Sequence, residues 1–268
     1  MAALIFVWPG AIAIGLSLGL LGSGGSILTV PVLVYLIGQP EKLAIAGSLA
    51  IVGAIAAVGS IPYIRSGLVN WRCVVMFGLP GMAGTYLGAW SAEFVSGAVQ
   101  LMLFAVVMLA ASVLMLKPIT VNENVDENVD ENADGRISEQ RAVWKISLDG
   151  LLVGIVTGLV GVGGGFLVVP ALVLLGGLPM RTAVATSLVI IALKSFSGFY
   201  KYLDVLASQG IALEWDVIAL VAALGIVGSL LGSLIGGRIP QDKLQKFFGV
   251  FLIAMGGFIL VQSARALF

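Results

Sequence analysis

Two glycine-rich stretches in this 268-residue chain have the residue types and spacing expected of an anion site. Residues 19–31 read GLLGSGGSILTVP, and residues 158–170 read GLVGVGGGFLVVP. Both lie in apolar sequence, where a break in a helix exposes backbone groups that need a partner. Glycine permits a positive φ and close backbone approach, and a helix that begins after the break presents free N–H groups and a positive dipole end. The sequence therefore predicts two tips that hold one anion between them.

The candidate substrate-binding residues are the tip residues and polar residues of the helices that follow. The first tip adds hydroxyl groups to its glycines, whereas the second tip has Val162 and Gly165 at the equivalent positions. Lys194 is the one cation deep in a predicted membrane crossing, and its charge suits an anion. The candidate set is Ser23, Gly24, Gly25, Ser26, Ser48, Gly163, Gly164, Gly165, Thr186, Ser187 and Lys194.

Each candidate also has a purely structural interpretation, and both interpretations are open at this point. The tip glycines can serve close helix packing. Packing is the favoured interpretation for six other glycines, Gly81, Gly84, Gly88, Gly225, Gly228 and Gly232. Ser48 and Ser187 can donate to the carbonyl four residues earlier in their own helix. Lys194 can extend its side chain toward the membrane interface near Lys201.

The composition places the chain in a membrane and leaves little chemistry for catalysis. Hydrophobic residues make up 59% of the sequence and charged residues 10%, with a mean hydropathy of +1.11, whereas a soluble domain carries about 25% charged residues. The chain has no His, and its single Cys73 excludes both an internal disulfide and a His/Cys metal site. No Walker lysine accompanies the glycines. We therefore expect a polytopic membrane protein that is not an enzyme, with no catalytic residue, cofactor, metal or nucleic-acid partner.

The chain divides into two homologous halves joined by an acidic linker. Residues 1–116 form the first membrane repeat and residues 144–268 the second, because the match continues beyond the tips through pairs such as Pro40 with Pro179. Residues 117–143 contain repeated NVDE units of low hydrophobicity and high charge. Such a composition predicts a disordered linker.

Each half is predicted to contain a short hairpin followed by three full crossings. The second apolar segments, at 27–37 and 166–176, reach only about half of the bilayer at a rise of about 1.5 Å per residue. Trp8 and Pro9 indicate an interfacial start that leaves residues 10–21 as a short first arm, and a steeply tilted first helix of full length is the alternative. The full crossings are expected at 43–64, 73–91, 98–116, 180–200, 216–236 and 246–263.

Loop charge predicts how the two halves are oriented. Arg65 and Arg72 flank the loop after the third segment of the first half, whereas the equivalent loop, 201–216, is more acidic. The next pair of loops reverses this difference, since 92–97 is acidic and 237–246 is basic. Cytoplasmic loops are enriched in Lys and Arg, so equivalent loops with opposite charge lie on opposite faces. We therefore predict an all-α polytopic membrane protein of two inverted-topology repeats, each a Gly-broken re-entrant hairpin of half-helices and three transmembrane helices, with both termini outside and a cytoplasmic linker.

The paired motifs resemble those of the TauE/SafE sulfite exporter family. The resemblance rests on residues 19–31 and 158–170, on ATSL at 185–188 and on the looser GSLA at 47–50, and it covers the chain except the linker. It implies a permease for small sulfur-containing anions, such as sulfite, sulfoacetate and other organosulfonates, in the cytoplasmic membrane of a bacterium or archaeon. Members of the family differ in the anion they carry.

The tips and the resemblance together lead to one main hypothesis. The chain is a secondary transporter, an exporter that works by alternating access with the anion held near the midplane of the membrane. An anion-selective channel is the alternative, and a membrane scaffold or partner subunit is a third. The expected partners are the anion and the lipid bilayer, while homo-oligomerisation and coupling to H+ or Na+ stay open.

Overall fold

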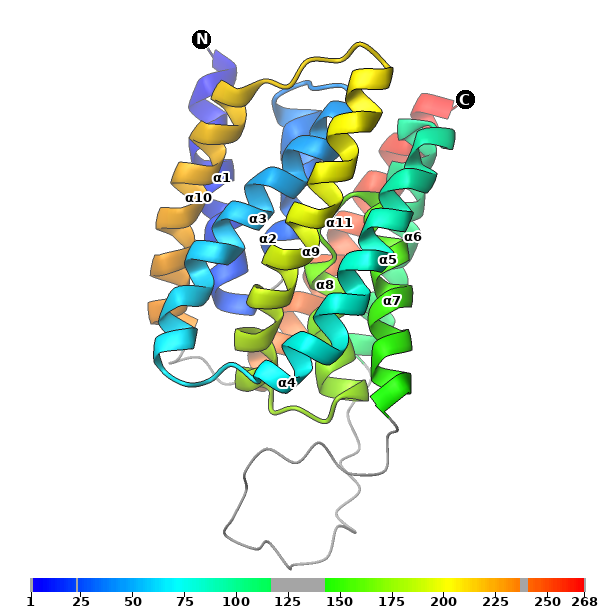
Figure 1. The fold of residues 1–268 in the computed structure, drawn as a ribbon. Helices are drawn as coiled ribbons and strands as arrows, with labels where there is room; N and C mark the ends of the chain where they lie inside the picture. Colours follow the sequence, from blue (N-terminus) through cyan, green and yellow to red (C-terminus); the bar gives the residue numbers. More distant parts are fainter. Residues whose placement is uncertain (1, 23, 117–142, 237–240, 268) are drawn as a thin grey trace, which may run out of the picture.

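The computed structural model describes residues 2–22, 24–116, 143–236 and 241–267. These residues form a bundle of helices with no strand among them (Figure 1). Ser23 and residues 117–142, which include nearly all of the predicted linker, lie outside the described residues. The prediction of an all-helical membrane protein is confirmed for the described part of the chain.

The order of the helices is the same in the two halves. The first half contains α1 (Ala2–Leu21), α2 (Gly24–Pro31), η1 (Val32–Leu36), α3 (Glu41–Arg65), α4 (Trp71–Cys73), η2 (Val74–Gly78), α5 (Leu79–Ser91), η3 (Ala92–Phe94) and α6 (Gly97–Leu116). The second half contains α7 (Val143–Val160), α8 (Gly165–Pro170), η4 (Ala171–Leu175), α9 (Met180–Ser208), α10 (Trp215–Gly236) and α11 (Gln241–Leu267). Among the described residues, four helices are long and apolar enough to span a membrane: Glu41–Arg65, Trp71–Phe94, Met180–Ser208 and Trp215–Ile235. They match four of the six predicted crossings, and α6 and α11 occupy the positions of the other two.

Each half begins with a hairpin that breaks at its glycine-rich tip. In Figure 1 the hairpin of α1 and α2 opens toward the upper end of the bundle, whereas the hairpin of α7 and α8 opens toward the lower end. The short second arms are confirmed. The prediction of a first arm limited to residues 10–21 is wrong, because α1 continues through Pro9 to Ala2. The apolar residues before Pro9 favour a helix, which pairs their backbone groups internally.

A proline interrupts both second arms at the same place. Pro31 ends α2 and Pro170 ends α8, and in each arm the next five residues form a π-helix. Proline has no N–H, and its ring crowds the carbonyl four residues earlier. A π-helical turn is wider than an α-helical turn and moves each hydrogen bond one residue further along the chain. The two prolines thus account for the widened turns in both hairpins.

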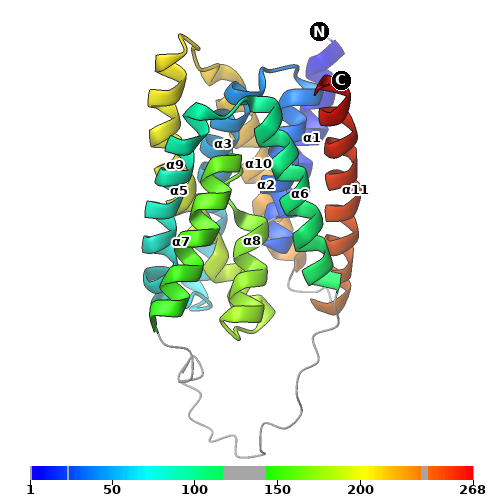
Figure 2. The ribbon, with the colours of Figure 1, turned by 90° about the vertical axis from the view of Figure 1, so that its right-hand side faces the viewer.

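Glycines bring helices of opposite halves into backbone contact. Figures 1 and 2 show α5 beside α7, and α1 packs against α10. A Cβ added at Gly84 would fall on the carbonyl oxygen of Leu151, and one added at Gly15 would fall on that of Gly225. Similar contacts to backbone atoms of the facing helix recur at Gly19, Gly88, Gly150, Gly154, Gly158, Gly228 and Gly232. The packing interpretation is therefore confirmed for Gly84, Gly88, Gly228 and Gly232, while added Cβ atoms at Gly81 and Gly225 would first meet the side chains of Lys194 and Ile55.

The two longest helices, α3 and α9, cross inside the bundle and position the site. A Cβ added at Gly53 of α3 would lie 3.2 Å from the Cβ of Ser195 in α9. Pro40 and Pro179 immediately precede the two helices with extended backbone, φ −54° with ψ 144° and φ −54° with ψ 141°. A proline at this place ends the preceding segment and needs no N–H partner. Both helices are largely buried in their first half.

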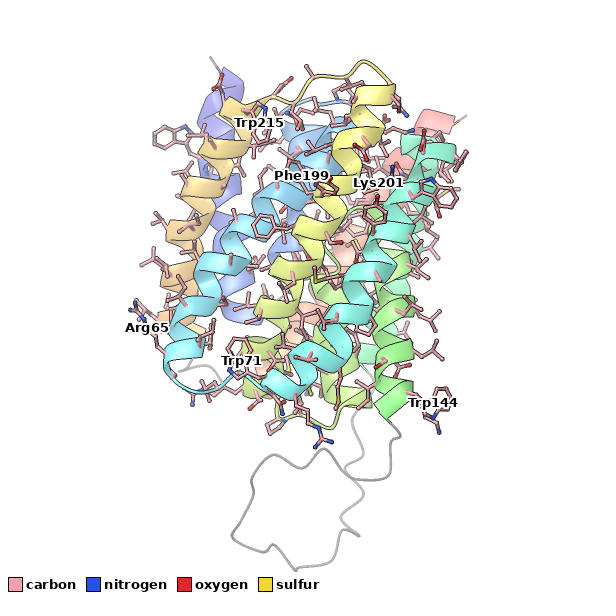
Figure 3. The ribbon with its side chains drawn as sticks, in the orientation of Figure 1. Arg65, Trp71, Trp144, Phe199, Lys201 and Trp215 are labelled. Carbon is pink, nitrogen blue, oxygen red and sulfur yellow. The ribbon has the colours of Figure 1, made fainter. Side chains whose placement is uncertain are left out.

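Aromatic and basic side chains mark the two ends of the bundle. In Figure 3, Trp215 and Lys201 lie toward the upper end, and Arg65, Trp71 and Trp144 lie at the lower end. The three tryptophans are more than half exposed. Tryptophan and basic residues are enriched where a membrane protein meets the lipid head groups. Their positions therefore indicate where the two membrane surfaces cross the bundle.

Replacing Gly84 with Val is expected to destabilise the protein, because the side chain would overlap the Leu151 carbonyl and push α5 away from α7. Overpacking of this kind costs about 1–3 kcal/mol, which should lower the thermal unfolding midpoint of the purified protein in detergent. Gly257→Ala is the matched control, since its Cβ would meet open space on α11. An unchanged midpoint for Gly84→Val would contradict the packing described above.

Candidate functional site

The two hairpin tips are enclosed by the long helices of the opposite halves. Gly22, which follows α1, has φ +68°, and a Cβ there would lie 2.8 Å from Val184 and 3.0 Å from the Ser187 hydroxyl of α9. Gly161, which follows α7, has φ +72°, and a Cβ there would overlap Ile45 of α3. Only glycine fits these positions without strain, because the backbone is left-handed and the neighbouring side chain already fills the space. Each half therefore closes over the tip of the other.

A pair of serines fixes the tips across the two halves. Ser48 of α3 donates to the carbonyl oxygen of Gly161 at 2.8 Å, and Ser187 of α9 donates to that of Gly22 at 3.2 Å. Each hydroxyl also lies 2.8 Å from the carbonyl three residues earlier in its own helix, so its single proton is shared between two carbonyls. Carbonyls at a helix end need such partners. These candidate residues reach the tips, and their hydroxyl protons point to the protein backbone.

Tyrosines hold the last turn before each tip. Tyr63 of α3 donates to the carbonyl of Gly19 at 3.1 Å, and Tyr202 of α9 donates to the carbonyl of Leu159 at 3.4 Å. Tyr202 is fully buried, and its hydroxyl also accepts a hydrogen bond from Gln100 at 3.0 Å. The end of each of the helices α1 and α7 therefore accepts two side-chain hydrogen bonds from the long helices, one from a serine and one from a tyrosine.

The first tip is compact and helical. Gly24 begins α2, and Gly25 lies within it. A Cβ at Gly25 would overlap the carbonyl of Ile14, so Gly25 packs the two arms of the hairpin together. Ser26 is fully buried on α2, and Thr29 donates to the Gly25 carbonyl at 2.7 Å. Gly22 is therefore the residue of this tip that needs a left-handed backbone.

The second tip is looser, with left-handed backbone at three of its glycines. Besides Gly161, Gly163 has φ +63° and Gly164 has φ +72°. A Cβ at Gly164 would overlap Thr157, whereas Gly165 is the first residue of α8. Among the described residues, the N–H groups of Gly163 and Gly164 have no backbone acceptor. This tip therefore offers backbone donors that the protein itself does not use.

Lys194 is buried in the bundle and does not extend to the membrane surface. Its side chain has no exposed area, and its Nζ has no hydrogen-bond partner among the described residues. A Cβ at Gly81 of α5 would lie 3.1 Å from Cδ of Lys194 and 3.3 Å from the carbonyl of Gly150 in α7. The interpretation that Lys194 extends to the interface is therefore wrong, since the Lys194 side chain packs beside Gly81 inside the bundle.

Thr186 lies away from the tips. Its hydroxyl oxygen accepts a hydrogen bond from the backbone N–H of Asn70 at 3.0 Å. Asn70 precedes α4, and its own side chain accepts from the N–H of Cys73 at 3.1 Å. Thr186 thus connects α9 to the start of the α4 segment, and the structure does not bring it to either tip.

Comparison with known proteins now places the chain. The family described as sulfite exporter TauE/SafE matches residues 7–259. The chain belongs to this family. No solved structure matches it.

Curated relatives of this TauE/SafE chain carry the description "Probable membrane transporter protein". One from Xylella fastidiosa (strain Temecula1) is 32% identical over 266 residues, which covers 95% of this chain and 94% of the relative. YunE of Bacillus subtilis (strain 168) is 28% identical over 271 residues, 96% of each chain. A relative from Methanocaldococcus jannaschii is 27% identical over 272 residues, 96% of this chain and 97% of the relative. The chain is therefore a multi-pass membrane transporter of the TauE/SafE type.

The TauE/SafE site contains one residue that the sequence did not indicate. Ser195 is fully buried, and its hydroxyl lies where a Cβ of Gly163 would be placed. It belongs to no motif, and its equivalent in the first half is Ala56, so the comparison of the two halves gave no signal for it. Only the packing of α9 against the second tip reveals it.

Replacing Ser48 with Ala in this TauE/SafE transporter should loosen the second tip, because the Gly161 carbonyl would lose its partner. A buried polar group left unpaired costs about 1–3 kcal/mol, so we expect a lower thermal midpoint and faster hydrogen exchange at residues 158–164. Ser112→Ala is the control, since Ser112 donates only to the Leu109 carbonyl of its own helix. Equal effects of the two substitutions would show that the bond across the halves contributes nothing.

Proposed function

We propose that this TauE/SafE protein is a secondary transporter that exports small sulfur-containing anions, such as sulfite or organosulfonates, across the cytoplasmic membrane. The substrate is held between the two glycine-rich tips and reaches each side of the membrane by alternating access. One observation carries the proposal: each half places a broken hairpin inside the bundle, and the opposite half closes over it through Ser48 and Ser187. Broken helices of this kind form the midplane binding sites of many secondary transporters.

The chemistry around the tips suits an oxyanion. Gly163 and Gly164 have N–H groups without a backbone acceptor among the described residues, and Lys194 adds a buried amino group without a partner among them, beside Gly81 of α5. Backbone amides at a helix start favour negative charge. Buried ionisable side chains in membrane segments mark substrate pathways. An anion with several oxygens, such as a sulfonate, matches this set of donors.

The arrangement of the helices supports alternating access. The first hairpin opens toward one end of the bundle and the second toward the other (Figure 1). The contact of α1 with α10 has its counterpart in the contact of α7 with α5, as expected when two inverted repeats exchange their first helices. Rocking of one repeat against the other around a fixed site is the usual motion of such transporters. Both hairpins then take part in opening and closing.

The membrane potential can drive the export. A monoanion that leaves an inside-negative cell gains about 2.3 kcal/mol per 100 mV. No acid is among the buried polar or charged residues of the described part of the chain, where Lys194 is the charged member. Export therefore needs no carboxylate to couple it to protons.

Replacing Gly164 with Val should abolish transport while the protein still inserts in the membrane. The side chain would overlap Thr157 and force an L-residue into φ +72° at the tip, which blocks the approach of an anion to the backbone. Sulfite and sulfoacetate efflux from proteoliposomes measures the loss. Gly67→Val is the matched control, since Gly67 has φ +67° in a loop with open space around its Cα.

Wild-type flux in Gly164→Val would refute the assignment of the tips as the binding site. Unitary currents in planar bilayers in place of saturable, counterflow-capable flux would identify the protein as an anion channel. The Gly67→Val control separates both results from a general effect of backbone strain.

The orientation follows from the same proposal and is tested separately. Arg65 and Trp71 lie at the end of the bundle where α7 begins (Figure 3), and Arg72 follows Trp71 in α4, so we place that end in the cytoplasm. With Cys73 replaced by Ala, a cysteine at exposed Ser66 should react with an impermeant maleimide only from the cytoplasmic side. A cysteine at exposed Gln209 should react only from outside. Labelling of both positions from one side would overturn this orientation.

A further inference from the structure

Serine hydroxyls in the helices of this protein almost all have a partner. Within the described residues, eight of them donate to a carbonyl three or four residues earlier in their own helix or at its end. They are Ser48, Ser60, Ser66, Ser91, Ser112, Ser187, Ser208 and Ser233. Ser195 and Ser229 are different, because each is fully buried and its hydroxyl has no partner among the described residues. A buried hydroxyl without a partner is costly, so each of these two serines needs an explanation.

The Ser195 hydroxyl points into the second tip. A Cβ added at Gly163 would overlap this hydroxyl oxygen, and it would lie 3.3 Å from Cγ1 of Val52 in α3. The hydroxyl is therefore directed toward the left-handed backbone of Gly163 and Gly164, whose N–H groups have no backbone acceptor within the described residues. A side-chain donor and two backbone donors lie together here, and none of them is paired with an acceptor in the part of the chain that the structure describes.

The Ser229 hydroxyl has a different environment. It points at Gly59 of α3, within the contact between α3 and α10. Both residues lie inside long helices, where backbone N–H groups donate to carbonyls of the same helix. No additional donor is left at that position, so Ser229 resembles Ser195 in burial but not in what surrounds it.

The two halves of the chain differ at this point. The equivalents of Lys194 and Ser195 in the first half are Ile55 and Ala56. Lys194 faces the glycines of α5 and α7, whereas Ser195, one residue later on α9, faces α3 and the second tip. At the second tip the hydroxyl group therefore comes from Ser195 of α9. The second tip has Gly165 at the position where the first tip has Ser26.

We infer that the Ser195 hydroxyl donates a hydrogen bond to an oxygen of the oxyanion at the second tip, beside the N–H groups of Gly163 and Gly164. The ligand class is a sulfur oxyanion or sulfonate, whose oxygens accept from several donors at once. This role rests on the proposed function, because it takes the transported anion as the missing acceptor. Gly163 is then required both for its left-handed backbone and for the space that the hydroxyl occupies.

The test compares Ser195→Ala with Ser229→Ala, which removes an equally buried and unpartnered hydroxyl that points at Gly59 of α3 and not at the second tip. Thermal shifts of the purified full chain are titrated with sulfite, thiosulfate and sulfoacetate. We expect Ser195→Ala to keep or raise the midpoint without anion, since an unpaired hydroxyl is removed, and to weaken anion binding by at least about tenfold. Ser229→Ala should bind the anions like the wild type.

Each other result overturns the role of Ser195. Wild-type affinity in Ser195→Ala, with the wild-type protein binding anions, removes Ser195 from the site and leaves the proposed function in place. Equal losses in Ser195→Ala and Ser229→Ala show a general effect on the fold. A wild-type protein that neither binds nor transports any of the three anions rejects the proposed function and the role of Ser195 together.

Discussion

A helix that breaks inside a membrane must find partners for its free backbone groups, and this constraint shapes the whole bundle. Here the partners come from the opposite half of the chain. The carbonyls of Gly22 and Gly161 accept from Ser187 and Ser48, which lie at equivalent positions of α9 and α3. Within each half, Tyr63 and Tyr202 pair the carbonyls of Gly19 and Leu159 slightly earlier in α1 and α7, so the carbonyls at Gly22 and Gly161 are the ones paired across the halves. The two long helices are therefore central, because each of them both follows one tip in sequence and holds the other tip in space.

Contacts between the two halves also determine how the helices pack. α1 lies against α10 and α7 lies against α5, so the first helix of each half belongs to the packing of the other half. Residues 1–116 and 144–268 remain the predicted sequence repeats, but the packed units combine helices of both. Glycines make this possible, since a side chain at Gly84 or Gly15 would overlap the facing backbone. Movement of one hairpin must consequently move helices of both halves together.

The sequence predicted those parts of the structure that depend on local residue type. Repeated glycines and prolines located both hairpins, and apolar length located the crossings. The sequence did not predict side-chain positions that depend on tertiary contacts. In helices that are apolar on all sides, periodicity does not show which face meets which neighbour, so the burial of Lys194 and the direction of Ser195 could not be read from spacing. The length of α1 is a further difference, because Trp8 and Pro9 predict a boundary and the helix continues through Pro9.

The two halves share a framework but not their chemistry. Equivalent serines, tyrosines and glycines hold both tips, yet the left-handed Gly163 and Gly164 and the pair Lys194 and Ser195 have no counterparts of the same kind among the described residues of the first half. Under the proposed function, a symmetric framework would let the bundle open toward one side and then the other, as in alternating access. An asymmetric site concentrates the donors on one hairpin, so that the proposed anion stays with that hairpin while the symmetric contacts rearrange around it. Symmetry thus supports the motion, and asymmetry supports recognition.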